Sequence, residues 1–541
     1  MTDALSTLQR DATLDCLERE SFELVVIGGG ISGAGIAREA ARRGVRVALV
    51  EAGDFAGGTS SKSSKLIHGG LRYLAHGEVG LVRETALERK TIHQLAPHLA
   101  EPRWMVLPTR SRAGLVKFRL AITAYEKLGA VASEDRHRTW TRKDLEAEEP
   151  ILDRAVHGHA CAYREYLTDD ARLVIANLRA AVAAGAVAIN HVPVDEILVE
   201  GGRACGVSAR CASSGRRVRI RARAVINAAG PWVEAVRRLE DSEAPPLLHL
   251  SKGIHVSIPA ERLPVRNLVL MTASDGRGLF ALRRGPVVYV GTTDTSWTGG
   301  ATRWPEVTST DVEYLLEALP RAFAVEPIKP EEVVAAWAGL RPLVAQPGKS
   351  PTEISRHDEI LTGPAGVVTV AGGKLTGYRP TARRALERAA QVAGLRLPPA
   401  PAEAPLPGGD FDGDLGRLER DLSARHSLSL PAAQRLVRLY GAEAEAVLAL
   451  GAEPIAGAET VVRGEIDWAI EREGALHVED VVYRRTRVAL YDPGAPAALG
   501  ERVAERMARR LGWSEERRAS EVSELRRHLA DDLAFAGPHH G

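Results

Sequence analysis

The sequence predicts an α/β fold with three parts: a parallel sheet with crossover helices, an antiparallel sheet, and a helical C-terminal region. Residues 22–51 follow the pattern of a strand, a glycine loop, a helix and a second strand, which is a βαβ unit. Residues 256–258, 268–271 and 287–291 alternate in hydropathy, as strands of an antiparallel layer do. After a proline-rich stretch, the rest of the chain shows helical periodicity.

The parallel part is assembled from separate stretches of the chain. The βαβ unit comprises a strand at 22–27, a loop at 28–33, a helix at 34–43 and a strand at 45–51. A polar loop and a helix follow, and several later segments are expected to rejoin this part: a helix at 169–184, and strands at 187–194, 218–227 and 367–371. We therefore expect a sheet whose strands are discontinuous in sequence.

These elements give the following predicted organisation. Residues 1–21 form an N-terminal extension, and residues 394–410, with five prolines, form a linker because proline interrupts helices and ladders. The remaining bounds are as follows: the first part at 22–100, 170–245 and 340–393, the antiparallel part at 101–169 and 246–339, and the all-helical domain at 411–541.

Composition excludes several classes of function. Of the 541 residues, 71 are Lys or Arg and 70 are Asp or Glu, so the net charge of +1 provides no field that would attract nucleic acid. The four cysteines form no CxxC pair and predict neither a disulfide framework nor a metal site. The acidic N-terminus is unlike a signal peptide, and no run of about 18 apolar residues occurs. We expect a cytoplasmic protein.

The glycine loop indicates a bound dinucleotide. Gly28, Gly30 and Gly33 follow the GxGxxG spacing, which allows a diphosphate to approach the backbone at the positive N-terminus of a helix. Glu51 ends the second strand, where its carboxylate can accept hydrogen bonds from ribose hydroxyls and would repel a 2′-phosphate. Glycines also mark tight turns without a ligand, but the coincidence of all these elements favours a Rossmann-like dinucleotide domain. The loop alone leaves FAD and NAD open.

Further segments carry a resemblance to a known family. They are TSSKSSKLIHGGLRY at 59–73, AAGPW at 228–232, SKGIH at 251–255, GTTD at 291–294, GLRPL at 339–343 and GGKLTGYR at 372–379. Together they resemble the FAD-dependent glycerol-3-phosphate dehydrogenase family, of the aerobic, membrane-associated type, and residues 464–488 resemble its C-terminal domain. The resemblance implies a non-covalent FAD that accepts a hydride at N5, oxidation of sn-glycerol 3-phosphate to dihydroxyacetone phosphate, and a quinone as the next acceptor.

The resemblance and the loop chemistry together define the expected cofactor contacts. The Ser and Lys residues at 60–65 are dense in hydrogen-bond donors, and backbone N–H groups at 372–376 can stabilise negative charge at the flavin pyrimidine edge. The expected cofactor-binding residues are Gly28, Gly30, Ile31, Ser32, Gly33, Glu51, Ala52, Thr59, Ser60, Ser61, Ser64, Lys65, Leu66, His68, Val194, Ala229, Gly230, Gly373, Lys374, Leu375 and Thr376.

The resemblance also assigns the substrate site. A phosphate favours arginine and lysine, and the expected substrate-binding residues are Arg72, Tyr73, His255, Thr293, Arg341 and Lys374. The expected catalytic residues are His255, Arg341 and Lys374. His255 is the candidate proton acceptor because imidazole titrates near neutral pH. As an alternative, Lys374 or Arg341 stabilises an alkoxide and there is no dedicated base.

Electron transfer to a quinone requires contact with a membrane surface. Residues 103–119 mix basic with aromatic and aliphatic side chains, which suits an anionic headgroup layer, although a basic face over a core helix has the same pattern. From the resemblance we expect a homodimer that is bound peripherally at the inner face of the cell membrane.

Three other functions remain open. One is a glycerol-3-phosphate oxidase that forms hydrogen peroxide, although the insertion typical of oxidases is not evident in this sequence. The second is an amino-acid or amine oxidase of the same fold, because arginines also bind carboxylates. The third is a partner-binding scaffold without turnover.

Overall fold

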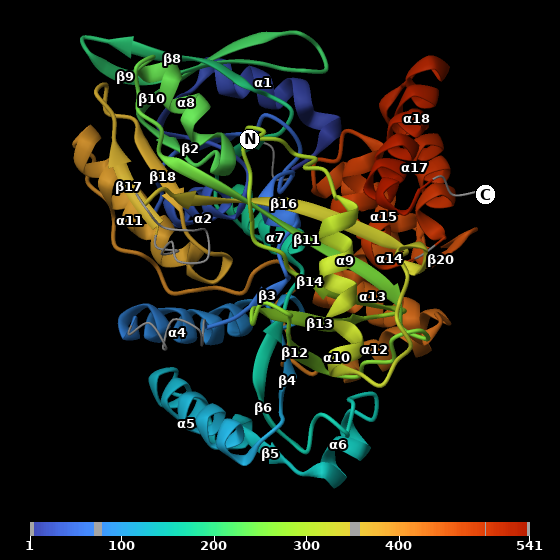
Figure 1. Ribbon diagram of the computed structural model, residues 1–541. Coiled ribbons are helices and arrows are strands. Elements are labelled where there is room, and N and C mark those ends of the chain that lie inside the picture. The colour runs from blue at the N-terminus through green and yellow to red at the C-terminus, as the bar shows by residue number, and fades with distance from the viewer. Residues whose placement is uncertain (1–4, 70–77, 347–357, 493, 538–541) are drawn as a thin grey trace.

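The computed structural model describes residues 5–69, 78–346, 358–492 and 494–537. Two large sheets lie in the middle of the described part, with helices on their outer faces, and the C-terminal helices gather at one side (Figure 1). Arg72 and Tyr73, which were predicted to bind the substrate, lie outside the described residues.

The first sheet has eight strands, and its core is parallel, as predicted. The parallel strands run in the order β18 (Val368–Gly372), β10 (Arg217–Asn227), β1 (Ser21–Ile27), β2 (Val47–Val50) and β7 (Val187–Ile189). Three antiparallel strands complete it: β17 (Asp358–Thr362), β9 (Arg203–Arg210) and β8 (Val194–Glu200). The parallel order brings the ends of β1, β2 and β10 to one edge.

Alternate residues of β1 bury opposite faces of this sheet, as a period of two requires. Leu24 and Val26 pack with the helices α2 (Ile31–Arg42), α7 (Asp170–Ala183) and α11 (Tyr378–Ala393). Val25 and Ile27 pack with β8, β9 and the helix α1 (Arg10–Arg19). The helix α8 (Val233–Glu240) follows β10. The sheet is therefore covered on both faces.

The second sheet has ten strands and is antiparallel apart from the pair β4 and β12. Its strands are β3 (Leu66–Ile67), β4 (Glu101–Thr109), β5 (Arg138–Trp140), β6 (His159–Leu167), β11 (Leu248–Pro259), β12 (Leu268–Thr272), β13 (Gly278–Arg284), β14 (Val287–Gly291), β15 (Thr295–Ser296) and β16 (Ala335–Val344). Because β3 and β16 belong to this sheet, the predicted domain bounds do not coincide with sheet membership, and they stay a prediction.

The second sheet is also covered on two faces. Val288 and Val290 pack toward α9 (Ser309–Glu317) and α10 (Leu319–Ala322), whereas Tyr289 packs into the C-terminal helices. Three more helices accompany the first part of this sheet: α4 (Val79–Leu95), α5 (Arg112–Leu128) and α6 (Arg142–Glu148).

The C-terminal domain is helical, as predicted, with one addition to the all-helical prediction. Its helices are α12 (Leu415–His426), α13 (Leu430–Tyr440), α14 (Ala444–Ala449), α15 (Arg463–Arg472), α16 (Val488–Tyr491), α17 (Ala495–Leu511), α18 (Glu515–Asp532) and the π-helix η9 (Asp480–Arg485). A two-stranded hairpin, β19 (Pro454–Ile455) and β20 (Ala458–Val462), turns at Gly457, whose positive φ suits a tight turn.

Short 3₁₀ helices complete the described elements. They are η1 (Thr7–Gln9), η2 (Thr59–Ser61), η3 (Pro97–Leu99), η4 (Ser133–Asp135), η5 (Gly230–Trp232), η6 (Pro330–Glu332), η7 (Leu375–Gly377), η8 (Gly441–Glu443) and η10 (Ala534–Ala536). Of these, η2, η5 and η7 lie within the motifs at 59–73, 228–232 and 372–379, and they belong to the site described next.

Candidate functional site

The turn between β1 and α2 has room only for glycine at two positions. Gly28 has a φ of 114°, and a Cβ there would lie 2.5 Å from the carbonyl oxygen of Ala228. A Cβ on Gly33 would lie 1.9 Å from the carbonyl oxygen of Gly28. Gly30 precedes the helix, so the N-terminus of α2 faces the turn. This cradle fits a diphosphate, which requires bare backbone at a positive helix end.

A cavity of about 350 Å³ opens beside this turn, within the range of roughly 300 to 1,000 Å³ that is typical of ligand sites. Most of the predicted cofactor residues line it: Gly28, Gly30, Ile31, Ser32, Glu51, Ala52, Thr59, Ser60, Val194, Ala229, Gly230, Gly373, Lys374 and Leu375. These residues come from four separate stretches of the chain, and the first sheet brings them together.

Glu51 is held in place by the backbone on either side of it. One carboxylate oxygen accepts a hydrogen bond from the N–H of Gly29 at 2.7 Å, and the other accepts one from the N–H of Gly53 at 2.7 Å. Each oxygen keeps a lone pair, so the carboxylate can still accept from a ribose hydroxyl.

The other predicted cofactor residues are not among those that line this cavity. They are Gly33, Ser61, Ser64, Lys65, Leu66, His68 and Thr376. The hydroxyl of Thr376 donates to the carbonyl oxygen of His68 at 3.1 Å, which ties the turn after β18 to the segment after β3.

The structure adds wall residues that the sequence had not indicated. Asp170 and Arg303 line the cavity although no motif contains them. Trp232 lines it too, at the end of the AAGPW segment, and its ring lies 3.0 Å from where a Cβ of Gly58 would be. The AAGPW motif could have indicated Trp232 as a wall residue, whereas the positions of Asp170 and Arg303 follow only from tertiary packing.

Arg341 projects from β16 toward the end of β14. Its guanidinium donates to the hydroxyl of Thr292 at 2.7 Å and to the carbonyl oxygen of Thr293 at 3.1 Å, and lies 3.3 Å from a carboxylate oxygen of Asp294. A Cβ on Gly253 would lie 2.3 Å from this guanidinium, so glycine leaves room for it. The structure thus brings together Arg341 and Thr293, two of the predicted substrate residues.

His255 lies buried in β11, next to the cavity wall. Its Nε2 lies 2.9 Å from the hydroxyl of Ser64, and its ring stacks on Trp337 at 5.0 Å. Burial, and then the positive charges of Lys65 and Arg341, hold the pKa of His255 well below its usual value. The imidazole is therefore neutral at neutral pH and can accept a proton.

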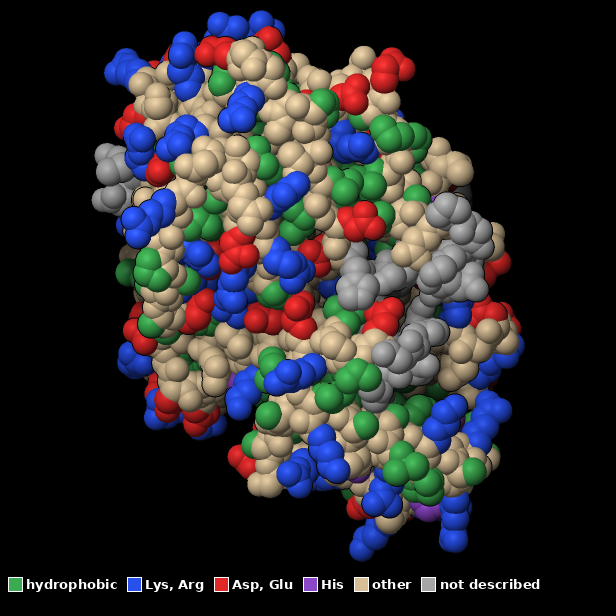
Figure 2. Space-filling view, turned by 90° about the vertical axis from the view of Figure 1, so that its left-hand side faces the viewer, with side chains coloured by type: hydrophobic (Ala, Val, Ile, Leu, Met, Phe, Trp, Pro, Cys, Tyr) green, Lys and Arg blue, Asp and Glu red, His purple; other side chains and the backbone are tan. Residues whose placement is uncertain are grey.

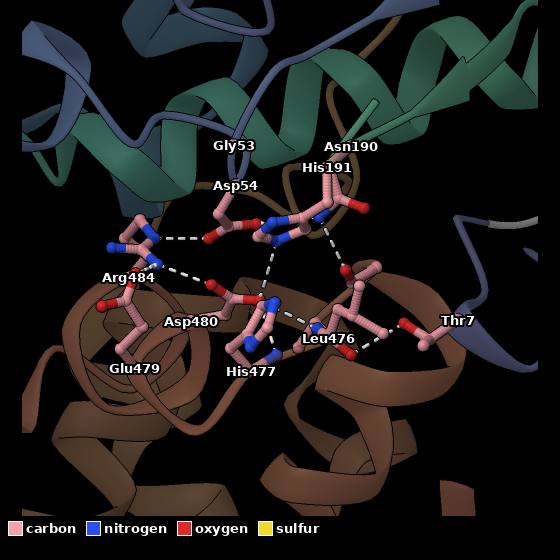
Figure 3. A network of polar contacts seen from close by, with 12 residues as sticks. Thr7, Gly53, Asp54, Asn190, His191, Leu476, His477, Glu479, Asp480 and Arg484 are labelled. Atoms are coloured by element: carbon pink, nitrogen blue, oxygen red, sulfur yellow. Dashed lines mark hydrogen bonds and ion pairs between the residues drawn. The ribbon is translucent and has the colours of Figure 1, made fainter. Parts of the chain in front are cut away.

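One group of described residues has the spacing of metal ligands: Asp54, His191 and Asp480. Arg484 pairs with Asp54 and with Asp480, as Figure 3 shows, and Arg485 pairs with Asp54 at 2.7 Å. Since arginines neutralise these acids, we interpret the group as an ion-pair network. The expectation of no metal stays a prediction.

Comparisons with known proteins agree with this geometry. Residues 23–379 match the family model of FAD dependent oxidoreductases, and residues 401–518 match that of the C-terminal domain of alpha-glycerophosphate oxidase. The chain is 36% identical to the aerobic glycerol-3-phosphate dehydrogenase of Staphylococcus haemolyticus over 96% of this chain and 97% of that protein. The protein of the same name from Bacillus subtilis is 34% identical over 98% and 99%.

Solved structures give the same result. The glycerol-3-phosphate dehydrogenase of Bacillus halodurans, solved in complex with FAD, matches 99% of both chains with a TM-score of 0.82 and 31% identity. The L-alpha-glycerophosphate oxidase of Mycoplasma pneumoniae, also with FAD, matches 71% of this chain and 97% of its own with a TM-score of 0.52. At 15% identity the latter likeness shows the fold alone.

Proposed function

The chain belongs to the FAD-dependent oxidoreductases, among the aerobic glycerol-3-phosphate dehydrogenases, and on this premise we propose that it oxidises sn-glycerol 3-phosphate to dihydroxyacetone phosphate. FAD, when bound in this cavity, would supply the hydride acceptor for carbon 2 of the substrate. The observation that supports this proposal most is the cavity beside the glycine turn, which is lined by residues of the motifs at 28, 59, 228 and 372.

Phosphate binding is assigned to Arg341 and Lys374. A guanidinium and an ammonium match the double negative charge of a phosphate, and charge-assisted hydrogen bonds are stronger than neutral ones. Arg341 is part-exposed at the end of β16, and Lys374 lines the cavity. We propose Arg72, Tyr73 and Thr293 as further substrate contacts.

Proton removal is assigned to His255. Because its ring is neutral, it can take the proton of the 2-hydroxyl as the hydride leaves. In the alternative, Arg341 or Lys374 stabilises the alkoxide and no base is needed. His255→Gln separates the two cases, because loss of a general base typically costs about 10²-fold to 10⁴-fold in rate whereas the alternative leaves kcat nearly unchanged.

Anaerobic spectroscopy tests the function. We expect glycerol 3-phosphate to bleach the flavin absorbance of the purified holoenzyme, and a soluble quinone analogue to restore it. Hydrogen peroxide formed in air at a similar rate would identify an oxidase instead. Bleaching by glycine or N-methyl glycine, and not by glycerol 3-phosphate, would identify an amine oxidase. A flavin that no substrate bleaches would support a scaffold role.

We further propose a quinone as electron acceptor and the helix α5 as the membrane contact. Val116 and Leu120 lie one turn apart on this helix and are 53% and 69% exposed, beside the exposed cations Arg112, Lys117 and Arg119. Figure 2 shows basic and apolar side chains side by side in the lower part of the face over α5. Of the predicted segment 103–119, the residues in β4 are partly or fully buried, so only its helical half presents such a face. No described helix is long and apolar enough to span a bilayer.

Sedimentation with vesicles tests the membrane contact. Leu120→Glu should abolish binding to vesicles that contain anionic lipid, because it places a charge in the contact face. Leu430→Glu, which changes an exposed leucine on α13, is the matched control and should bind as the parent protein does. Equal binding by both variants would contradict the assignment to α5. We also propose that the protein is attached peripherally at the inner face of the cell membrane. We further propose that it forms a homodimer, which light scattering tests.

A further inference from the structure

Three arginines of the C-terminal domain reach into the Rossmann-like part of the molecule. Arg484, Arg485 and Arg487 are at most 3% exposed, although arginine is rarely buried. Arg484 and Arg485 end the π-helix η9 and pair with Asp54, in the loop after β2, and Figure 3 shows the contact of Arg484 with Asp54. The C-terminal domain therefore contacts the first domain through charged side chains as well as through apolar packing.

Arg487 makes the contacts closest to the cavity. Its guanidinium donates to a carboxylate oxygen of Asp170 at 2.8 Å, to Asp169 at 3.1 Å and to the carbonyl oxygen of Ser61 at 3.1 Å. The backbone at Arg487 has a φ of 63°, a conformation that residues other than glycine rarely adopt. The contacts of the side chain are consistent with a backbone that the surroundings hold in place.

These contacts converge on residues 59–65, which we call the flavin loop. The carboxylate of Asp170 accepts hydrogen bonds from the N–H of Ser63 at 3.0 Å and from its hydroxyl at 2.7 Å, and pairs with Lys65 at 3.2 Å. The ammonium of Lys65 also donates to the carbonyl oxygen of Ser61 at 2.9 Å. Ser63 and Asp170 both line the cavity. Arg487 is thus one of two cations that hold the carboxylate to which the loop is tied.

We propose that Arg487 is a positioning residue, through which the C-terminal domain holds the flavin loop in the conformation that binds FAD. The proposal rests on FAD as the cofactor of the proposed function. Arg487 itself does not line the cavity, so it acts through Asp170 and Ser61. Without its guanidinium, Asp170 keeps Lys65 and Ser63 but loses its partner on the other side, and Ser61 loses a donor.

FAD affinity, measured without substrate, tests the proposal. Arg487→Met, which keeps the length and removes the charge, should raise the dissociation constant of FAD by about tenfold or more and alter the spectrum of the bound flavin. Arg487→Lys should restore part of the affinity, because it keeps the charge and one hydrogen bond. The matched control is Arg506→Met, which breaks an ion pair with Asp467 within the C-terminal domain at 2.7 Å. This control should lower the melting temperature and leave FAD affinity unchanged.

A second pair of variants covers the case in which Arg487→Met does not fold. Asp170→Asn combined with Arg487→Met leaves no unpaired buried carboxylate at position 170, and it is compared with Asp170→Asn alone. Arg487 keeps its hydrogen bond to the carbonyl oxygen of Ser61 in Asp170→Asn and loses it in the double variant, so the proposal requires weaker FAD binding in the double variant than in the single one. Parental affinity and spectrum in Arg487→Met, or equal affinity in this second pair, would overturn it. Because no substrate is present, neither result depends on whether glycerol 3-phosphate is oxidised.

Discussion

The two halves of the cofactor cavity are built in different ways. The turn at residues 28–33 is a backbone structure, contained in one short stretch and shaped by the absence of side chains at Gly28 and Gly33. The flavin loop depends on buried side chains from distant segments, with Asp170 and Arg487 holding it from behind. A substitution that adds a side chain should therefore disrupt the turn, whereas a substitution that removes a charged group should disrupt the flavin loop.

The largest effect is expected for Gly33→Val. The added side chain would collide with the carbonyl oxygen of Gly28, so the turn cannot form and the protein should be isolated without FAD. The absence of flavin absorbance in the purified variant is the measurement. Gly80→Ala, at a helical glycine with no atoms within 4 Å of its Cβ position, should retain the flavin and match or slightly exceed the parent in stability. A yellow Gly33→Val protein would contradict this account of the turn.

The next largest effect is expected for the buried ion pairs between the C-terminal domain and the first domain. Asp54→Ala leaves the buried Arg484 and Arg485 without their shared carboxylate, and losing one member of a buried ion pair typically costs about 3 to 5 kcal/mol of unfolding free energy. Urea unfolding measures this loss. Asp275→Ala breaks the part-exposed pair with Arg277 and should cost about 1 kcal/mol or less. Equal losses of unfolding free energy in the two variants would mean that the buried pairs of Asp54 stabilise the protein no more than the part-exposed pair of Asp275 does.

A smaller effect is expected on substrate binding. Arg341→Ala removes a proposed phosphate contact and should raise KM by about 10-fold to 100-fold, since a hydrogen bond between charged groups contributes about 1.5 to 3 kcal/mol. The flavin spectrum should stay as in the parent because Arg341 does not line the cavity. Arg262→Ala, which removes a part-exposed arginine paired with Glu332 after β11, is the kinetic control. Unchanged kinetics in Arg341→Ala would remove this residue from the substrate site.

The smallest effect is expected on the pH dependence of kcat. Since the pKa of His255 is lowered, its neutral form persists below pH 6.5, and kcat should fall only in more acidic solution. Lys65→Met removes a positive charge that lowers this pKa, so the acidic limb of the pH profile of kcat should move to higher pH. Lys252→Met, at a lysine of β11 paired with Asp311, should leave the limb in place. A limb that does not move in Lys65→Met would contradict the assignment of His255 as the base.

Local patterns predicted much of the fold. The βαβ unit, the helix at 169–184 and the strand before Gly372 all occur where periodicity predicted them, within a few residues. The helix α2 begins at Ile31, three residues earlier than predicted, because a helix can include glycines of the loop once tertiary contacts support it. The hairpin β19–β20 was missed because its strands are too short to show a period.

Sequence alone determined the family and indicated the glycine turn and many of the residues that line the cavity, because each depends on motifs whose residues are neighbours in the chain. Only the tertiary structure decided that Asp170 lines the cavity, that His255 is buried and neutral, and that Arg487 reaches the flavin loop from the last domain. The physical reason is that the strength of a charge interaction depends on burial and on partners in space. Neither can be read from the spacing of residues along the chain.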